Sequence, residues 1–150
     1  MVKSRVKDLI EAREARGAIA FQGWLRTKRQ SKNCAFLAIN DGSSQESIQA
    51  VVDAGNAELT SVVSELTTGS SLMVQGNLRE SLGKGQRFEV DVTGLEIIGS
   101  ASGDYPLQKK GHSLEFLREI GHLRPRTNTH GAVFRVRSEL ALSVHDFFRD

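Results

Sequence analysis

The sequence predicts a mainly β fold, a small barrel of five strands with one helix inserted between the third and fourth strands. Three observations support it. Apolar and polar residues alternate in five separate segments, as in strands that bury one face. Turn-forming residues such as Asn40-Asp41-Gly42 separate the segments. One stretch between the third and fourth segments returns to helical spacing.

The first strand begins at Gly17 and places Ile19, Phe21, Gly23 and Leu25 on one side. The other strands are expected at Ala35–Asn40, Ser47–Asp53, Ser71–Arg79 and Gln86–Ile98. In the last of them the apolar alternation changes phase at Gly94, which predicts a β-bulge. The helix is expected from Ala57 to Leu66, with Gly69 ending it. This order of elements is that of the OB-fold, a five-stranded Greek-key barrel that commonly binds oligonucleotides.

Three regions are expected along the chain. The OB-fold domain covers residues 1–99, and its first 16 residues form a brief helix or an ordered arm. Small polar residues after Ile98 predict a hinge over residues 100–130. Residues 131–150 form a helix whose apolar stripe needs a partner: Val133, Val136, Leu140, Val144 and Phe147.

Composition and motifs exclude several classes of function. The chain of 150 residues is 39% hydrophobic and 25% charged, with no apolar run of membrane-spanning length and no signal peptide, so we expect a cytoplasmic location and no membrane partner. Cys34 is the single cysteine, which excludes an internal disulfide and a thiolate zinc site. No phosphate loop, nucleophile elbow or zinc-protease motif is present. We therefore expect neither catalytic residues nor a metal site.

The charge distribution favours a polyanionic partner as much as a solvated surface. The net charge is only +2, but Arg26, Lys28, Arg29 and Lys32 lie in a stretch without acidic residues. A second basic cluster extends from Lys109 to Arg137.

Strand parity predicts the binding face. Leu37 and Ile39 share one side of the second strand, which leaves Phe36 on the outer side. Gln49 and Glu89 lie opposite to the core residues of their own strands. An aromatic ring stacks an unpaired base, amide and carboxylate groups read base edges, and cations meet phosphates. The alternatives are a Phe36 buried in the barrel and ordinary exposed roles for Gln49 and Glu89.

The chain resembles the class II aminoacyl-tRNA synthetases of the subgroup that charges tRNA with aspartate, asparagine or lysine. In the barrel the resemblance rests on the stretches Gly23–Arg29, Phe36–Gly42 and Ile48–Val51. The stretches Tyr105–Ser113, Phe116–Arg118 and His122–Thr129 are similar to the asparaginyl enzymes and differ from the aspartyl and lysyl ones.

The resemblance implies roles for the residues on the predicted face. Phe36 stacks on an anticodon base, Gln49 reads the central uridine, Arg29 contacts the anticodon, and Glu89 belongs to the same site. We expect Arg26, Lys28 and Lys32 to contact the RNA backbone. Partner and ligand expectations follow: the anticodon loop of tRNA for this chain, and ATP with Mg²⁺ for the full-length ligase.

The resemblance also predicts what this chain does alone. Asp150 falls inside the helix of the first class II motif, so the ATP site is absent and we expect no aminoacylation. The full-length family is dimeric, and we expect a monomer or weak association here. Two alternatives stay open: a free-standing OB-fold that binds single-stranded nucleic acid, and a protein-interaction module that uses the C-terminal helix.

Overall fold

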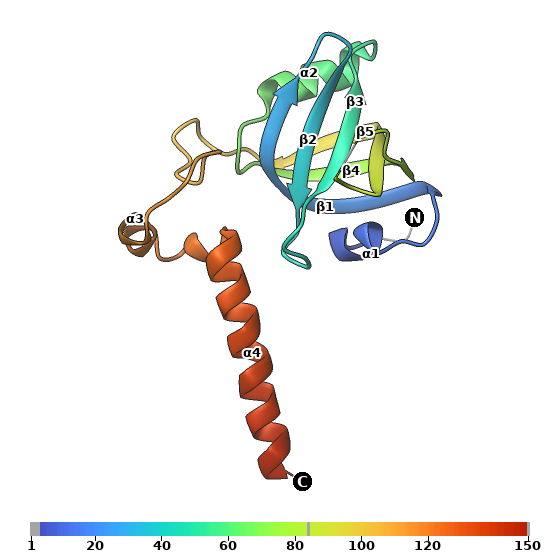
Figure 1. The fold of residues 1–150 in the computed structure, drawn as a ribbon. Helices are drawn as coiled ribbons and strands as arrows, with labels where there is room; N and C mark the ends of the chain where they lie inside the picture. Colours follow the sequence, from blue (N-terminus) through green and yellow to red (C-terminus); the bar gives the residue numbers. More distant parts are fainter. Residues whose placement is uncertain (1–3, 84, 150) are drawn as a thin grey trace. The chain divides into compact units, whose positions relative to one another are not determined.

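The computed structural model describes residues 4–83 and 85–149, and the chain divides into two compact units, Met1–Lys109 and Lys110–Asp150. The first unit contains all five strands (Figure 1). They are β1 (Arg16–Gln30), β2 (Cys34–Asn40), β3 (Ile48–Asp53), β4 (Ser71–Glu80) and β5 (Phe88–Gly99). Among the described helices, none combines the length and hydropathy needed to cross a membrane.

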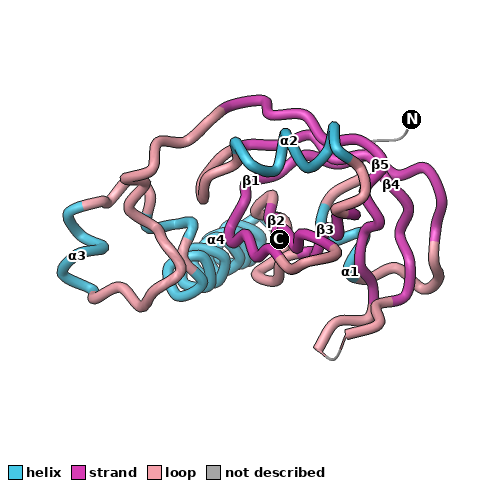
Figure 2. The backbone as a smooth tube through the Cα atoms, turned by 90° about the horizontal axis from the view of Figure 1, so that it is seen from above, coloured by secondary structure: helices cyan, strands magenta, loops and turns pink. Residues whose placement is uncertain are grey.

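The strands close into a barrel in the order β1-β2-β3-β5-β4. The β3–β5 pair is parallel, and the other neighbouring strands are antiparallel. Helix α2 (Ala57–Glu65) connects β3 to β4 and lies across the ends of the strands, as Figure 2 shows from above. This arrangement confirms the predicted OB-fold.

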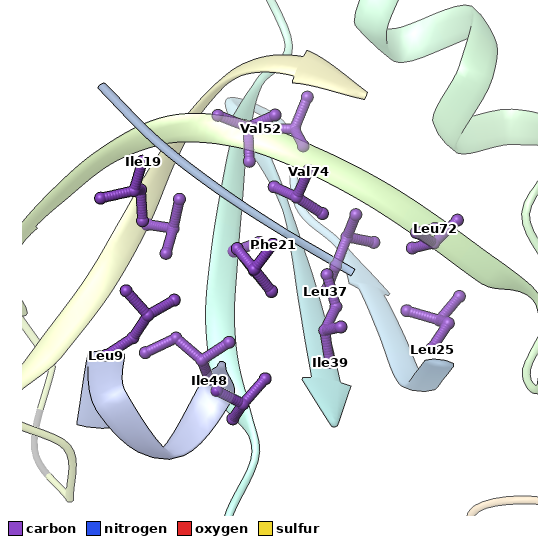
Figure 3. Close-up of a cluster of buried hydrophobic side chains, with 14 of the residues drawn as sticks. Leu9, Ile19, Phe21, Leu25, Leu37, Ile39, Ile48, Val52, Leu72 and Val74 are labelled. Atoms are coloured by element: carbon purple, nitrogen blue, oxygen red, sulfur yellow. The ribbon is translucent and has the colours of Figure 1, made fainter. Parts of the chain in front are cut away.

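The barrel interior is filled by the side chains that the alternation selected. Phe21, Leu25, Leu37, Ile39 and Val74 are all at most 1% exposed and converge from different strands (Figure 3). Each such side chain contributes roughly 1.5–3 kcal/mol by leaving water. The outer positions of the same strands are therefore fixed as well, because a strand cannot rotate without exposing this core.

The short helix α1 (Val6–Ile10) closes the end of the barrel opposite to α2 (Figure 1). Val6 and Leu9 are fully buried, and Leu9 points at the core beside Ile48 (Figure 3). The backbone N–H of Val6 donates to the Asp41 carboxylate at 2.9 Å, which joins the helix to the turn after β2. Of the two expectations for this segment, the structure has the brief helix.

Register shifts occur in several pairs of barrel strands, and two of them bear on the predictions. In β5, Gln75 pairs with Gly94 and Gly76 with Val92, so Thr93 is the extra residue and the predicted bulge is confirmed. In β1, the pairing with β2 skips Arg26 between Leu25 and Thr27. This second bulge was not predicted, and it reverses the direction of every following side chain in β1.

Helix α2 ends earlier than predicted. Its last residue is Glu65, so the expectation that Gly69 ends it is wrong. Gly69 instead forms the turn into β4 at φ +96°, and its N–H donates to the Leu25 carbonyl at 2.8 Å. A Cβ there would lie 2.8 Å from the Tyr105 ring, so the position needs glycine for its space as well as for its φ.

The second unit is helical. It contains α3 (Leu114–Glu119), a 3-10 turn (Arg124–Arg126) and α4 (Asn128–Arg149). Helix α4 begins three residues before the predicted start. The Thr127 hydroxyl oxygen precedes the helix and caps its N-terminus by accepting the His130 N–H. The predicted stripe on α4 is exposed, from 55% at Val133 to 77% at Phe147.

Candidate nucleic-acid interface

The outer face of β1, β2 and β3 presents Phe36 in the middle strand. Phe36 is half-buried, whereas Leu37 beside it is fully buried, so the ring faces outward as parity predicted. In register it lies between Arg29 of β1 and Val51 of β3. Val51 is 7% exposed and supports the ring from one side.

Arg29 lies against the ring from the other side. Its guanidinium carbon is 4.7 Å from the centroid of the Phe36 ring, a cation–π contact. The bulge at Arg26 is the cause: without it, Arg29 would share the inward parity of Leu25. The structure thus brings together two residues that the sequence predicted for one site.

Lys28 takes a different position from the predicted one. After the bulge it pairs with Leu37 and points inward. Its ammonium donates to the carbonyls of Val63 at 3.0 Å and Leu66 at 2.7 Å. The Val63 carbonyl also accepts the N–H of Leu66, so Lys28 adds a charged donor at the C-terminal end of α2, and its cation is not presented to a phosphate.

The other two predicted phosphate contacts lie nearer the surface. Lys32 is exposed in the turn between β1 and β2, three residues after Arg29 in the sequence. Arg26 is half-buried at the bulge itself. Arg26 belongs to the strand that carries Arg29, and Lys32 follows the end of that strand.

Gln49 and Glu89 meet on the neighbouring strands. Gln49 lies opposite Ala38 on the outer face, and its Nε2 donates to Glu89 Oε2 at 3.4 Å. Ala38 is small, so no side chain separates the Gln49 amide from the Phe36 side of the face. The single bond to Glu89 leaves the amide oxygen and a second N–H for a ligand.

Glu89 is buried more deeply than the sequence indicated. The residue is only 4% exposed, and its carboxylate accepts three hydrogen bonds besides that of Gln49. Arg79 Nε donates at 3.1 Å, Ser81 Oγ at 3.0 Å and Gln86 Nε2 at 3.4 Å. A carboxylate with this many donors is held in one orientation, which in turn orients the Gln49 amide.

Arg79 is the residue of this site that the sequence reasoning missed. It pairs with Glu89 across β4 and β5, and its Nη1 is 3.7 Å from Asp91. The side chain is 43% exposed, so one edge of the guanidinium faces solvent. The signal was the short connection between β4 and β5, which sets residues 79 and 89 opposite each other once the strands are aligned.

The arrangement is suited to binding. The Phe36 ring with Arg29 against it and the Gln49 amide share one face, and the buried Glu89 carboxylate holds Gln49 and Arg79. Among residues 4–83 and 85–149, no group of three or more His, Cys, Asp or Glu side chains is placed to hold a metal ion.

Comparison with known proteins identifies the kind of domain. Residues 19–98 match the family model described as an OB-fold nucleic acid binding domain. Asparagine–tRNA ligases from Synechocystis sp. and Phocaeicola vulgatus are 50% and 47% identical to this chain, over 100% and 99% of it, and the chain covers 33% and 32% of them.

Solved structures show the same fold. The asparaginyl-tRNA synthetase of Pyrococcus horikoshii, complexed with asparaginyl-adenylate, superposes with a TM-score of 0.82 at 24% identity, over 98% of this chain and 34% of that one. A putative aspartyl-tRNA synthetase from Leishmania major superposes with a TM-score of 0.84 at 18% identity, over 99% of this chain and 32% of that one.

The chain therefore belongs to the family of OB-fold nucleic acid binding domains. Within that family it is an anticodon-binding type of domain homologous to part of the asparagine–tRNA ligases, and it spans about a third of the length of the curated relatives it matches.

Proposed function

We infer that this chain binds the anticodon loop of tRNA(Asn) and acts as the anticodon-reading part of an asparagine–tRNA ligase. The observation that carries this proposal is that an outward Phe36 ring and the Gln49 amide share one face of the barrel, on the neighbouring strands β2 and β3. A ring and an amide together can stack a uridine and hydrogen-bond its carbonyl and N–H.

The cations and the carboxylate complete the proposed site. Arg29 packs on Phe36 and contributes to anticodon contact, while Arg26 and Lys32 meet the RNA backbone. Glu89 acts mainly by holding Gln49 and Arg79, since it is buried beneath them. Lys28 is left out of the proposed set because it caps α2.

The remaining proposals concern the whole protein. Anticodon reading is assigned to the barrel, a hinge to the segment after it, and the first helix of a catalytic region to α4. The expected boundaries at residues 99 and 130 differ from the division of the compact units after Lys109 and from the start of α4 at Asn128. ATP and Mg²⁺ would act in the part of the ligase beyond this chain, in a homodimer located in the cytoplasm. This chain alone is expected to bind tRNA without charging it.

The test is a comparison of RNA stem-loops by equilibrium binding to the whole chain. A stem-loop with a GUU anticodon should bind about 5- to 150-fold more tightly than the same stem-loop with its central uridine replaced by cytidine, since one mismatched reading contact costs roughly 1–3 kcal/mol. Equal binding of both RNAs would contradict the proposal and favour a binder of single strands without anticodon preference.

A further inference from the structure

A second hollow lies on the outer surface of the barrel, away from Phe36. It has a volume of about 540 Å³, within the range of small-molecule sites. Trp24 and Ile98 form its apolar wall, and they are 37% and 52% exposed. Gln22 and Ser71 provide polar groups beside the indole.

The hollow continues the proposed RNA-binding face along β1 and β2. Trp24 pairs with Asn40 at one end of the β1–β2 ladder, and Arg29 pairs with Phe36 toward the other. Asn40 and Phe36 are four residues apart on β2, which is about 13 Å of strand. Of the three pairs between the two aromatic positions, the outward one is Thr27 with Ala38, and both of its side chains are small.

The charges of the hollow fit a neutral ring. Arg5 and Asp41 are the charged residues of its wall, and their formal charges cancel. Asp41 is occupied by the N–H groups of Val6 and Ser43, and the Arg5 side chain, 69% exposed, pairs with Asp8 at the rim. An aromatic wall with amide and hydroxyl groups and no net charge matches a nucleobase better than an isolated phosphate.

We propose that this hollow is a second nucleotide subsite, in which Trp24 stacks a loop base of the tRNA outside the anticodon triplet. The proposal rests on the anticodon function proposed above. The base proposed on Phe36 is the uridine at the centre of the triplet. The two bases next to the one on Phe36 complete the triplet, so a base some 13 Å away along the strand belongs to the flanking loop.

The indole itself reports on the proposal, because Trp24 is the only tryptophan in the chain. The GUU stem-loop is titrated into the whole protein and the tryptophan fluorescence is followed. Stacking of a base should quench it strongly at saturation. Abasic substitutions, placed one at a time at the loop positions on both sides of the triplet, should restore the fluorescence at one position and weaken binding there about tenfold.

Two variants provide the matched comparison. Trp24→Leu should bind the intact stem-loop about tenfold more weakly, and the abasic substitution should no longer change its affinity. Trp24→Phe should keep most of the affinity and most of the response to the abasic substitution. Thermal unfolding of each variant checks that the barrel is intact. The abasic series uses the unchanged protein, so its result does not depend on whether a variant folds.

The outcomes separate the two proposals. Unchanged fluorescence at saturation, or Trp24→Leu binding as tightly as the unchanged chain, would overturn the subsite and leave anticodon reading in place. Equal binding of stem-loops with altered anticodons would overturn anticodon reading. If none of the flanking abasic substitutions restored the fluorescence, the quenching would come from something other than base stacking. That result would also overturn the subsite.

Discussion

At the scale of single residues, the site depends on one ring whose removal leaves the barrel intact. Phe36 is half-buried on the outer face, so Phe36→Ala removes a stacking surface without opening a cavity in the core. We expect binding of the GUU stem-loop to weaken about 5- to 150-fold, which corresponds to about 1–3 kcal/mol for one stacked base. Titration by fluorescence anisotropy measures it.

The matched control for this change is Phe148→Ala. Phe148 is 81% exposed on α4, outside the proposed face. It should leave RNA affinity unchanged. Equal losses from both variants would show that the effect at Phe36 comes from general destabilisation.

The buried Glu89 makes a second prediction at this scale. Arg79→Met removes the charged partner of a carboxylate that is 4% exposed, leaving it with neutral donors. Stability should fall by about 1–3 kcal/mol in urea unfolding. Replacing both residues with methionine should restore part of that loss, because the unpaired buried charge is then gone. A double variant that lost more unfolding free energy than the two single variants together would contradict this account.

At the scale of elements, the bulge in β1 decides which cations face the RNA. It turns Lys28 inward to cap α2 and Arg29 outward onto Phe36. Lys28→Met should therefore lower stability by roughly 1.5–3 kcal/mol, the value of hydrogen bonds to a charged group. It should leave the salt dependence of RNA binding unchanged.

Lys32→Met is the counterpart to that variant. Lys32 is exposed in the β1–β2 turn, so its loss should leave stability unchanged and reduce the slope of log affinity against log salt by roughly 0.7 for one phosphate contact on a single strand. Urea unfolding and binding at several salt concentrations give both quantities. The opposite pattern in the two variants would overturn the assignment of these lysines.

The same bulge shows where sequence reasoning was sufficient. The alternation of Leu37 and Ile39 with Phe36 gave the outer position of the ring correctly, because β2 has no irregularity. The expected RNA contact of Lys28 did not allow for the register shift at Arg26, which has no local signal comparable with Gly94 in β5. The burial of Glu89 was also missed, because Arg79, Ser81 and Gln86 reach it only after the β4–β5 pairing is set.

Helix α1 gives a prediction about pH. Burial alone raises the pKa of Asp41, but the hydrogen bonds from Ser43 and from the N–H of Val6 outweigh it and hold the pKa below its ordinary value. A carboxyl with a lowered pKa in the folded state adds stability above its unfolded pKa of about 3.9, and this is lost as pH falls through the folded value.

Asp41→Asn should remove this dependence. Unfolding in urea at about pH 7 and again below about pH 3.9 should show a larger loss of stability for the unchanged chain than for the variant. Glu46→Gln, which removes an exposed carboxylate of the same loop, controls for the change in net charge. Identical acid sensitivity in the unchanged chain and Asp41→Asn would show that the contact with α1 does not depend on this carboxylate.

At the scale of the whole molecule, α4 is the part that the described chain leaves uncovered. Leu140 and Phe147 are 61% and 77% exposed on its apolar stripe, and surfaces of this kind favour association. We expect the mass of the chain in light scattering to rise with concentration. Leu140→Glu combined with Phe147→Glu should keep it at the monomer mass and leave the affinity for the GUU stem-loop unchanged, since the proposed RNA site lies in the other unit. If association persisted in the double variant, contact through α4 would be excluded. If the double variant also bound RNA more weakly, the assignment of association to α4 and of RNA binding to the other unit would be wrong.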